Sequence, residues 1–143
     1  MASSEDRFAN LIKSGYIKAE PPDESEFNGL VSSAAGFISD ARITQLGIDS
    51  RFLLAYEAAH SFAQAALRRL GYRTDQRKFV FDVLEHTLSF PAGKARLLSN
   101  CHGQRNKALY EGGFSANEQL LDELILITQE LQVAVSALGV PRT

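Results

Sequence analysis

Several features that mark particular classes of protein are scarce or missing in this chain of 143 residues. Its single cysteine, Cys101, excludes an internal disulfide framework. The sequence has no run of about 18 or more apolar residues, so we expect no membrane-spanning segment. The N-terminal residues lack the basic and apolar regions of a signal peptide. Together these features favour a cytoplasmic protein.

Motifs that hold a metal ion or cradle a phosphate in a dedicated loop are also missing from the sequence. The histidine, cysteine and acidic residues do not fall at metal-ligand spacings, and there is no glycine-rich phosphate loop. We therefore expect neither a metal nor a cofactor. Sustained apolar/polar alternation, which a half-buried strand needs, is likewise missing. The sequence therefore predicts helices almost throughout.

Charge is unevenly distributed along the chain, although the net charge is only −2. The stretch from Arg68 to Lys107 holds nine basic and three acidic residues, whereas the remainder holds six basic and fourteen acidic ones. Such a cluster can form a local positive surface, or it can be spread over solvated helix faces. The sequence leaves both arrangements open.

Helical periodicity of the apolar residues predicts an all-α fold, an antiparallel helical bundle of four to five main helices plus a short N-terminal helix. The length suits one domain. Residues 1–22 form the N-terminal helix and a proline-containing extended segment, and residues 23–139 form the bundle. The expected helices cover residues 4–14, 23–44, 50–70, 74–88, 92–111 and 115–138.

Side chains at the expected helix ends refine these boundaries. Asp49 or Ser50 is a suitable N-cap for the alanine-rich helix over 50–70, and Gly71 is suited to the position after its end. Ser115 and Glu118 fit a capping box at the start of the last helix. Small alanine side chains let neighbouring helices approach the helix over 50–70 closely.

Four polar side chains lie on one side of the predicted helix over 92–111. His102, Asn106 and Tyr110 are successive i, i+4 neighbours, and Arg105 follows His102 by three residues, so all four occupy an arc of about 140°. A guanidinium beside hydrogen-bonding groups suits an oxyanion such as a phosphate. The same group also suits an arginine paired with a carboxylate of the next helix, or an interface between two copies of this helix.

Residues 105–110 read RNKALY, which resembles the signature of the HEPN superfamily (higher eukaryotes and prokaryotes nucleotide-binding). That signature is an arginine, then a polar residue, with a histidine about four to six positions beyond the arginine. Residues 54–73 resemble the long alanine-rich helix of the family, and residues 11–41 resemble the N-terminal part of small stand-alone bacterial members. This chain carries an Arg-Asn-x-x-x-Tyr variant of the motif.

The resemblance implies an RNA- or nucleotide-binding protein, and family members include metal-independent ribonucleases that act as toxins of toxin–antitoxin or defence modules. It also implies a homodimer through the motif helix, with an antitoxin or a nucleotidyltransferase as a further partner. By the family pattern, Arg105 binds the scissile phosphate and Asn106 orients it. We expect Arg105 to contact nucleic acid together with the basic residues Lys94, Arg96 and Lys107.

Tyr110 stands where the family has the histidine that activates the ribose 2′-hydroxyl. The ordinary pKa of tyrosine is about 10 and that of histidine about 6.5, so tyrosine is a poor general base at neutral pH. Tyr110 can instead donate a hydrogen bond to a phosphate or stack on a base. His102, one turn before Arg105, is the other candidate base. A non-catalytic dimeric interaction module or scaffold is the alternative function.

The remaining histidines and the cysteine are interpreted as structural. Tyr56, His60 and Gln64 form an i, i+4 row on the alanine-rich helix, which we interpret as a hydrogen-bonded row in the core or an interface. His86 is expected at the surface, and Cys101 is expected as a small buried residue.

Overall fold

The computed structural model describes residues 4–112 and 116–141. In chain order its elements are α1 (Ser4–Lys13), β1 (Lys18–Ala19), α2 (Glu24–Ala41), α3 (Ile48–Arg69), β2 (Tyr72–Arg73), α4 (Arg77–Asp82), α5 (Leu84–Leu88), α6 (Ala92–Asn106), the π-helical turn η1 (Lys107–Glu111) and α7 (Glu118–Leu138). The predicted all-α fold with a short N-terminal helix is confirmed.

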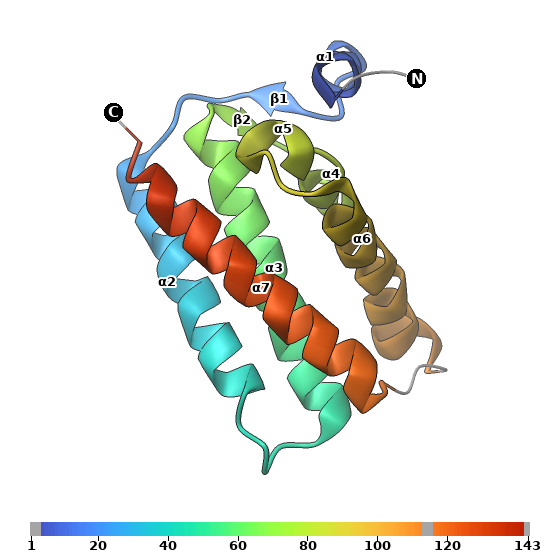
Figure 1. Ribbon diagram of the computed structural model, residues 1–143. Coiled ribbons are helices and arrows are strands. Elements are labelled where there is room, and N and C mark those ends of the chain that lie inside the picture. Colours follow the sequence, from blue (N-terminus) through green and yellow to red (C-terminus); the bar gives the residue numbers. More distant parts are fainter. Residues whose placement is uncertain (1–3, 113–115, 142–143) are drawn as a thin grey trace.

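The long helices α2, α3, α6 and α7 form a bundle in which consecutive helices run in opposite directions (Figure 1). Helix α3 lies in the middle of the bundle. It packs against α2 and α7, and also against α4, α5 and α6 (Figure 1). Helix α1 lies at one end of the bundle, beside α5. Within the described ranges, no helix combines the length and the hydropathy that crossing a membrane requires.

The composition of α3 explains its central position. Six of its alanines are fully buried, and because a methyl group is small, neighbouring helices approach the α3 backbone closely: Ala55, Ala58, Ala59, Ala63, Ala65 and Ala66. Phe52 and Phe62 are also fully buried and fill the space between the helices. The polar side chains that this packing buries have to find partners within the protein.

Helix α2 begins where the sequence predicts. The Asp23 side chain accepts hydrogen bonds from the backbone N–H groups of Ser25 (2.9 Å) and Glu26 (3.3 Å), which satisfies two donors of the first turn.

The predicted N-cap of α3 is wrong. Gly47 precedes α3, and the carboxylate of Asp49 instead accepts a hydrogen bond from the backbone N–H of Ala116 (2.9 Å). Helix α7 begins at Glu118 and is capped by Asn117, whose Oδ1 accepts from the N–H of Leu120 (2.8 Å). Ser115, of the predicted capping box, lies outside the described residues. Asparagine caps as well as serine does, and the bond to Asp49 fixes the chain just before it.

Two predicted helices are interrupted. The segment predicted as a helix over 74–88 forms α4 and α5, with Val83 between them at φ −101° and ψ 8°. Phe81 and Leu84, on either side of this break, are both fully buried. The segment predicted over 92–111 is α-helical through Asn106, after which η1 continues as a π-helix.

A short antiparallel sheet is a feature that the sequence did not predict. Lys18 pairs with Arg73 and Ala19 with Tyr72, so the extended N-terminal segment lies along the chain that follows α3. Gly71 permits this pairing because it turns the chain with φ +90°, a conformation that favours glycine.

Arg68 joins this segment to the bundle. Its side chain is 2% exposed, and Nε donates to the carboxylate of Glu26 (2.6 Å). Nη1 donates to the carbonyl oxygens of Glu20 (3.0 Å) and Tyr72 (3.3 Å), and Nη2 donates to that of Pro21 (2.8 Å). One guanidinium therefore links α3, α2 and the N-terminal segment.

Replacing Arg68 by alanine is expected to lower the free energy of unfolding by about 2–4 kcal/mol, because buried acceptors lose charged donors. Arg69 provides a matched control on the same helix. It donates to the carbonyl oxygens of Gly139 (3.0 Å) and Leu138 (2.8 Å) near the surface, and Arg69→Ala should cost about 1 kcal/mol. Urea denaturation followed by circular dichroism measures both changes, and equal losses would contradict the role given to Arg68.

Candidate functional site

The predicted motif residues gather where the end of α6 faces the middle of α3. His102, Arg105 and Asn106 belong to the last turns of α6, and Tyr56 reaches them from α3. Tyr56 is fully buried, whereas the three residues of α6 are partly exposed. The site is thus anchored in the core and open to the surface on one side.

A chain of hydrogen bonds connects these four side chains. Arg105 Nη1 donates to Asn106 Oδ1 (3.4 Å), and Asn106 Nδ2 lies 3.3 Å from His102 Nε2. His102 Nδ1 lies 2.9 Å from the hydroxyl oxygen of Tyr56. With Asn106 oriented toward Arg105 in this way, Nε2 of a neutral His102 is the acceptor and Nδ1–H donates to Tyr56. The unprotonated nitrogen therefore lies on the side of Asn106 and Arg105.

Two arginines share one carboxylate at this site. Arg77, at the start of α4, donates from Nη1 to both oxygens of Glu57, at 3.0 and 3.2 Å. Arg105 Nη2 lies 3.5 Å from Glu57 Oε1. Two positive charges thus face a single negative charge, which leaves the group with an excess of one positive charge. Such an excess favours a bound anion.

The side chain of Arg105 is 13% exposed and lies close to two aromatic rings. Its Cζ lies 5.6 Å from the centre of the Tyr56 ring and 6.0 Å from that of Tyr110. Its Nε–H is buried and makes no hydrogen bond with any described residue. A buried donor in this condition costs about 1–3 kcal/mol, and such groups call for a functional or structural explanation.

The π-helical turn η1 places Tyr110. In a π-helix the repeating hydrogen bond joins residues i and i+5, whereas in an α-helix it joins residues i and i+4. Tyr110 therefore lies over Arg105, five residues before it, and not over Asn106. Tyr110 is 75% exposed, and its neighbour Leu109 is exposed as well. Tyr110 therefore offers an aromatic face at the open side of the site.

Both histidines near Arg105 have lowered pKa values. Burial lowers the pKa of His102, and the positive charges of Arg105, Arg77 and Lys78 lower it further, against a smaller opposing effect of Asp82. Burial, together with Arg77, Arg105 and His102, lowers the pKa of His60 from 6.5 to about 3. Both rings are therefore neutral at neutral pH, and His102 can accept a proton.

Two further groups have raised pKa values. Burial raises the pKa of Tyr56, although Arg77 and Arg105 beside it act in the opposite direction. Tyr56 therefore remains a neutral phenol beside His102. Burial also raises the pKa of Cys101 to about 12, which agrees with the expected buried, unreactive thiol.

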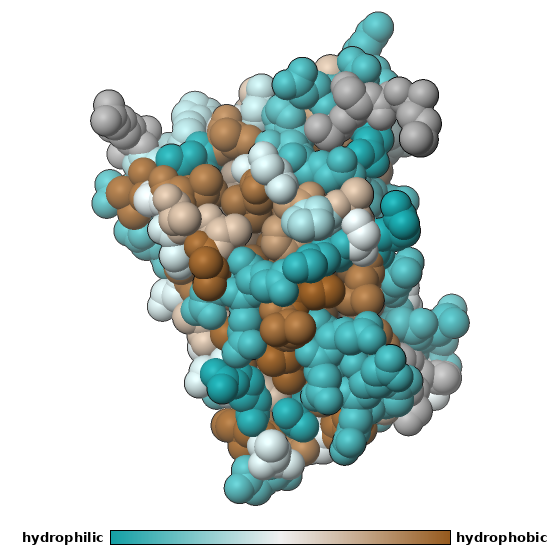
Figure 2. Space-filling view, in the orientation of Figure 1, coloured by the Kyte–Doolittle hydropathy of each residue, from teal (hydrophilic) through white to brown (hydrophobic). Residues whose placement is uncertain are grey.

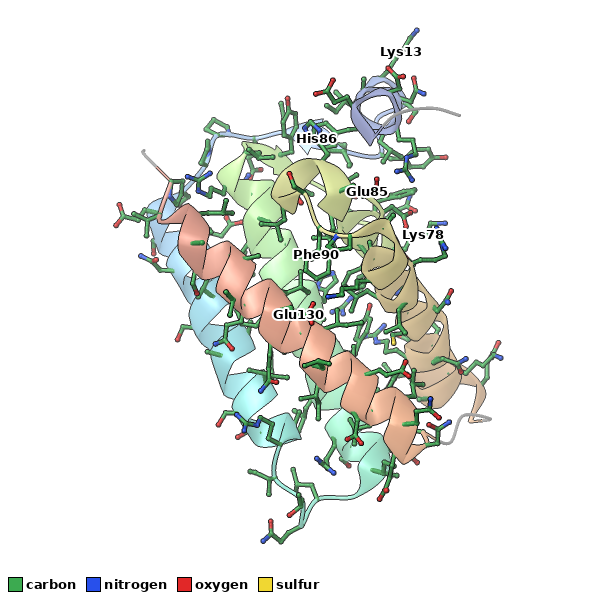
Figure 3. The ribbon with its side chains drawn as sticks, viewed as in Figure 1. Lys13, Lys78, Glu85, His86, Phe90 and Glu130 are labelled. Atoms are coloured by element: carbon green, nitrogen blue, oxygen red, sulfur yellow. The ribbon has the colours of Figure 1, made fainter. Side chains whose placement is uncertain are left out.

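The basic residues expected to contact nucleic acid do not all lie together. Lys107 is exposed on η1, close to Arg105 in the chain. Lys94 forms an ion pair with Glu130 of α7. Figure 3 labels Glu130 on the near side of the bundle. Arg96 is exposed on α6 and lines a surface groove with Arg7 and Asp82. Lys94 and Arg96 thus precede the motif by two or more helical turns.

Three residues of the site were not expected there. The sequence places Tyr56 in a polar row that indicates a core or an interface. In the structure its hydroxyl group reaches His102. Arg77 stood out only as one member of the basic stretch, and Glu57 gave no signal in the sequence. His86, expected at the surface, is half-buried and stacks on Phe8 with ring centres 4.2 Å apart.

Across residues 4–112 and 116–141, no group of three or more histidine, cysteine or acidic side chains could hold a metal ion. Comparison of the chain with protein-family models, with curated proteins and with solved structures finds no match. The geometry of the site therefore has to carry the functional argument.

His60 generates a prediction about pH and stability. Its pKa is lower in the folded protein than in the unfolded chain. Its contribution to the free energy of unfolding is therefore fully retained above about pH 6.5 and is lost as the pH falls toward about 3. In that range the free energy of unfolding should decrease by up to about 1.4 kcal/mol per pH unit from this residue. Urea denaturation between pH 7.5 and about pH 4.5 measures the slope.

The variant His60→Asn provides the comparison, because it removes the titrating group and keeps a polar side chain of similar shape. Its free energy of unfolding should depend less steeply on pH than that of the unsubstituted protein. Parallel pH dependences in the two proteins would show that burial of His60 does not penalise its charged form.

Proposed function

We propose that the protein binds RNA or a nucleotide through a phosphate group at Arg105, Asn106 and His102. The observation that carries this proposal is the contact of Arg105 with Asn106, which in turn contacts the neutral ring of His102. These side chains lie in a group with an excess of positive charge. The resemblance of residues 105–110 to the HEPN motif supports it.

The phosphate competes with Glu57 for Arg105. The distance from Glu57 to Arg105 is 3.5 Å, against 3.0 Å to Arg77, so Arg105 is held less tightly. When a phosphate binds Arg105, Glu57 keeps its two bonds to Arg77 and is not left unpaired. A guanidinium binds two phosphate oxygens at once, which fixes the orientation of the ligand.

His102 supplies the base for RNA cleavage without a metal ion. Its Nε2 accepts a long hydrogen bond of 3.3 Å from Asn106, and a ribose 2′-hydroxyl takes the place of that amide. The 2′-oxygen gives its proton to Nε2 and bonds to the phosphorus, and the bond from phosphorus to the 5′-oxygen breaks. The 5′-oxygen takes up a proton from water, and His102 later releases its proton to water, which leaves a 2′,3′-cyclic phosphate and a 5′-hydroxyl.

Tyr110 then binds rather than reacts. Its ring is 75% exposed and lies over Arg105, so a base can stack on it while the phosphate is held by the guanidinium. The proposal includes a homodimer through α6 and η1. Leu109 and Tyr110 form an exposed apolar surface beside the site that suits such an interface. The toxin role, with an antitoxin or nucleotidyltransferase partner, follows from the family resemblance.

A second candidate function is a non-catalytic interaction module. The ion pair between Arg105 and Glu57 favours a structural role for the arginine. Apolar side chains are also visible along the outer face of α7 (Figure 2), where Leu126 and Val133 are 59% and 71% exposed. In this case Arg105 would stabilise the packing of α6 on α3, and its removal would change stability or assembly rather than RNA binding.

Replacing Arg105 by alanine is expected to weaken binding of single-stranded RNA by about ten-fold or more, because a charged hydrogen bond to phosphate contributes about 1.5–3 kcal/mol. Fluorescence anisotropy at low salt with a chelator present measures the affinity. Arg42, exposed at the end of α2, is a matched control whose alanine variant should bind as the unsubstituted protein does.

Equal affinity of the Arg105→Ala and Arg42→Ala variants would contradict the phosphate site. Unchanged RNA binding together with a changed oligomeric state in Arg105→Ala would favour the interaction module.

RNA cleavage assays distinguish the role of His102 from that of Tyr110. His102→Gln should slow RNA cleavage by about 100-fold or more while RNA still binds, because the proton acceptor is lost. Tyr110→Phe should keep most of the activity, because the stacking ring remains. Mass spectrometry of the products detects the cyclic phosphate. Loss of cleavage in Tyr110→Phe with activity retained in His102→Gln would reverse the assignment, and binding without cleavage would remove the ribonuclease step.

A further inference from the structure

We propose that a groove between α1 and α4 binds a nucleobase of the same RNA strand whose phosphate lies at Arg105. This inference rests on the proposed function and extends it to a second nucleotide further along the strand. The groove measures about 580 Å³, and its walls include Leu11, Tyr16 and Phe79, with the polar side chains of Asn10, Ser14 and Asp82 around them. Apolar walls with a few polar groups are typical of small-ligand sites.

Tyr16 is the central feature of the groove. Its ring is 48% exposed, whereas the next residue, Ile17, is buried. Gly15 has φ +83° and turns the chain after α1, so that consecutive side chains point outward and inward. Both backbone polar groups of Tyr16 are bound: its N–H donates to Leu11 (3.0 Å), and its carbonyl accepts from the Thr74 hydroxyl (2.7 Å). An exposed aromatic ring on a fixed backbone is a ready stacking surface.

Phe79 enlarges this surface. Its ring centre lies 5.2 Å from that of Tyr16, with 50° between the ring planes. Lys78 Nζ lies 5.5 Å from the centre of the Phe79 ring, and Figure 3 shows the Lys78 side chain pointing outward beside α6. Aromatic rings with a lysine beside them match a base and its phosphate.

The groove is connected to the motif. Asp82 forms part of its wall and accepts a hydrogen bond from the Ser99 hydroxyl (2.9 Å) on α6. Ser99 precedes His102 by one helical turn, about 5 Å along the helix. The charges of Lys78 and Asp82 both act on the pKa of His102. A second groove shares Arg7 and Asp82 as walls and is lined by Arg96. A strand bound at Arg105 can therefore continue past Arg96 and Lys78 to Tyr16.

The experiment measures the affinity for a short single-stranded RNA by fluorescence anisotropy at low salt. Tyr16→Ala should weaken binding at least about five-fold, because a stacked base contributes about 1–3 kcal/mol. Tyr16→Phe should bind as the unsubstituted protein does, because the ring stays. Val133→Ala removes another exposed apolar side chain, on α7, and should have no effect.

A second measurement uses the unsubstituted protein, so it does not depend on whether a variant folds. RNA containing 4-thiouridine is bound and irradiated, and the cross-linked peptides are identified by mass spectrometry. Cross-links should fall in the peptides that contain Tyr16 or Phe79.

The outcomes separate the two proposals. If Arg105→Ala loses RNA binding but Tyr16→Ala does not, and the cross-links fall elsewhere, the nucleobase groove is overturned and the phosphate site stands. If the unsubstituted protein binds no single-stranded RNA at low salt, the nucleobase groove is overturned, and so is RNA as the ligand of the phosphate site. Loss of binding in Tyr16→Ala with recovery in Tyr16→Phe, together with cross-links at the groove, supports the inference.

Discussion

The burial of α3 is the constraint on which the rest of the structure depends. Because α2, α4, α5, α6 and α7 all pack against it, its buried polar side chains have to be satisfied inside the protein. At one end Arg68 meets this requirement with Glu26 and the carbonyl groups of the N-terminal segment. In the middle Tyr56 meets it with His102 of α6. The first solution holds the fold together, and the second creates the candidate site.

The site follows from that second contact. Tyr56 fixes the orientation of His102, and burial, together with the surrounding arginines, lowers its pKa so that the imidazole is neutral. The same arginines share Glu57, so the positive charge that lowers the pKa of His102 is also the charge that attracts an anion. The proposed base and the proposed phosphate-binding group thus share one arrangement of charges. This arrangement leaves the Nε–H of Arg105 buried without a hydrogen-bond partner among the described residues, which is energetically unfavourable.

The sequence predicted the helices well, because long amphipathic segments have a strong periodic signal. It also brought His102, Arg105 and Asn106 to one face, as the structure has them. It did not predict the break at Val83 or the π-helical turn that carries Tyr110 over Arg105. Helices α4 and α5, on either side of that break, both pack against α3, a contact that local periodicity does not encode.

The same limit applies to helix ends and to partners of the motif. Asp49 looks like an N-cap in the sequence, yet it binds Ala116, which is distant in the chain. Glu57 gave no signal at all, because what makes it part of the site is the approach of Arg77 and Arg105 from two other helices. Contacts of this kind are visible only once the helices are packed.

The central claim is that an RNA phosphate binds between Arg105 and a neutral His102. Long-range ¹H–¹⁵N correlation spectra of the histidine and arginine side chains test it most directly, recorded at neutral pH before and after addition of single-stranded RNA. His102 should show a neutral ring protonated on Nδ1, and its Nε2 signal and the Nε–H signal of Arg105 should shift when RNA binds. A charged His102 in the free protein, or RNA binding that leaves both signals unchanged, would contradict the claim.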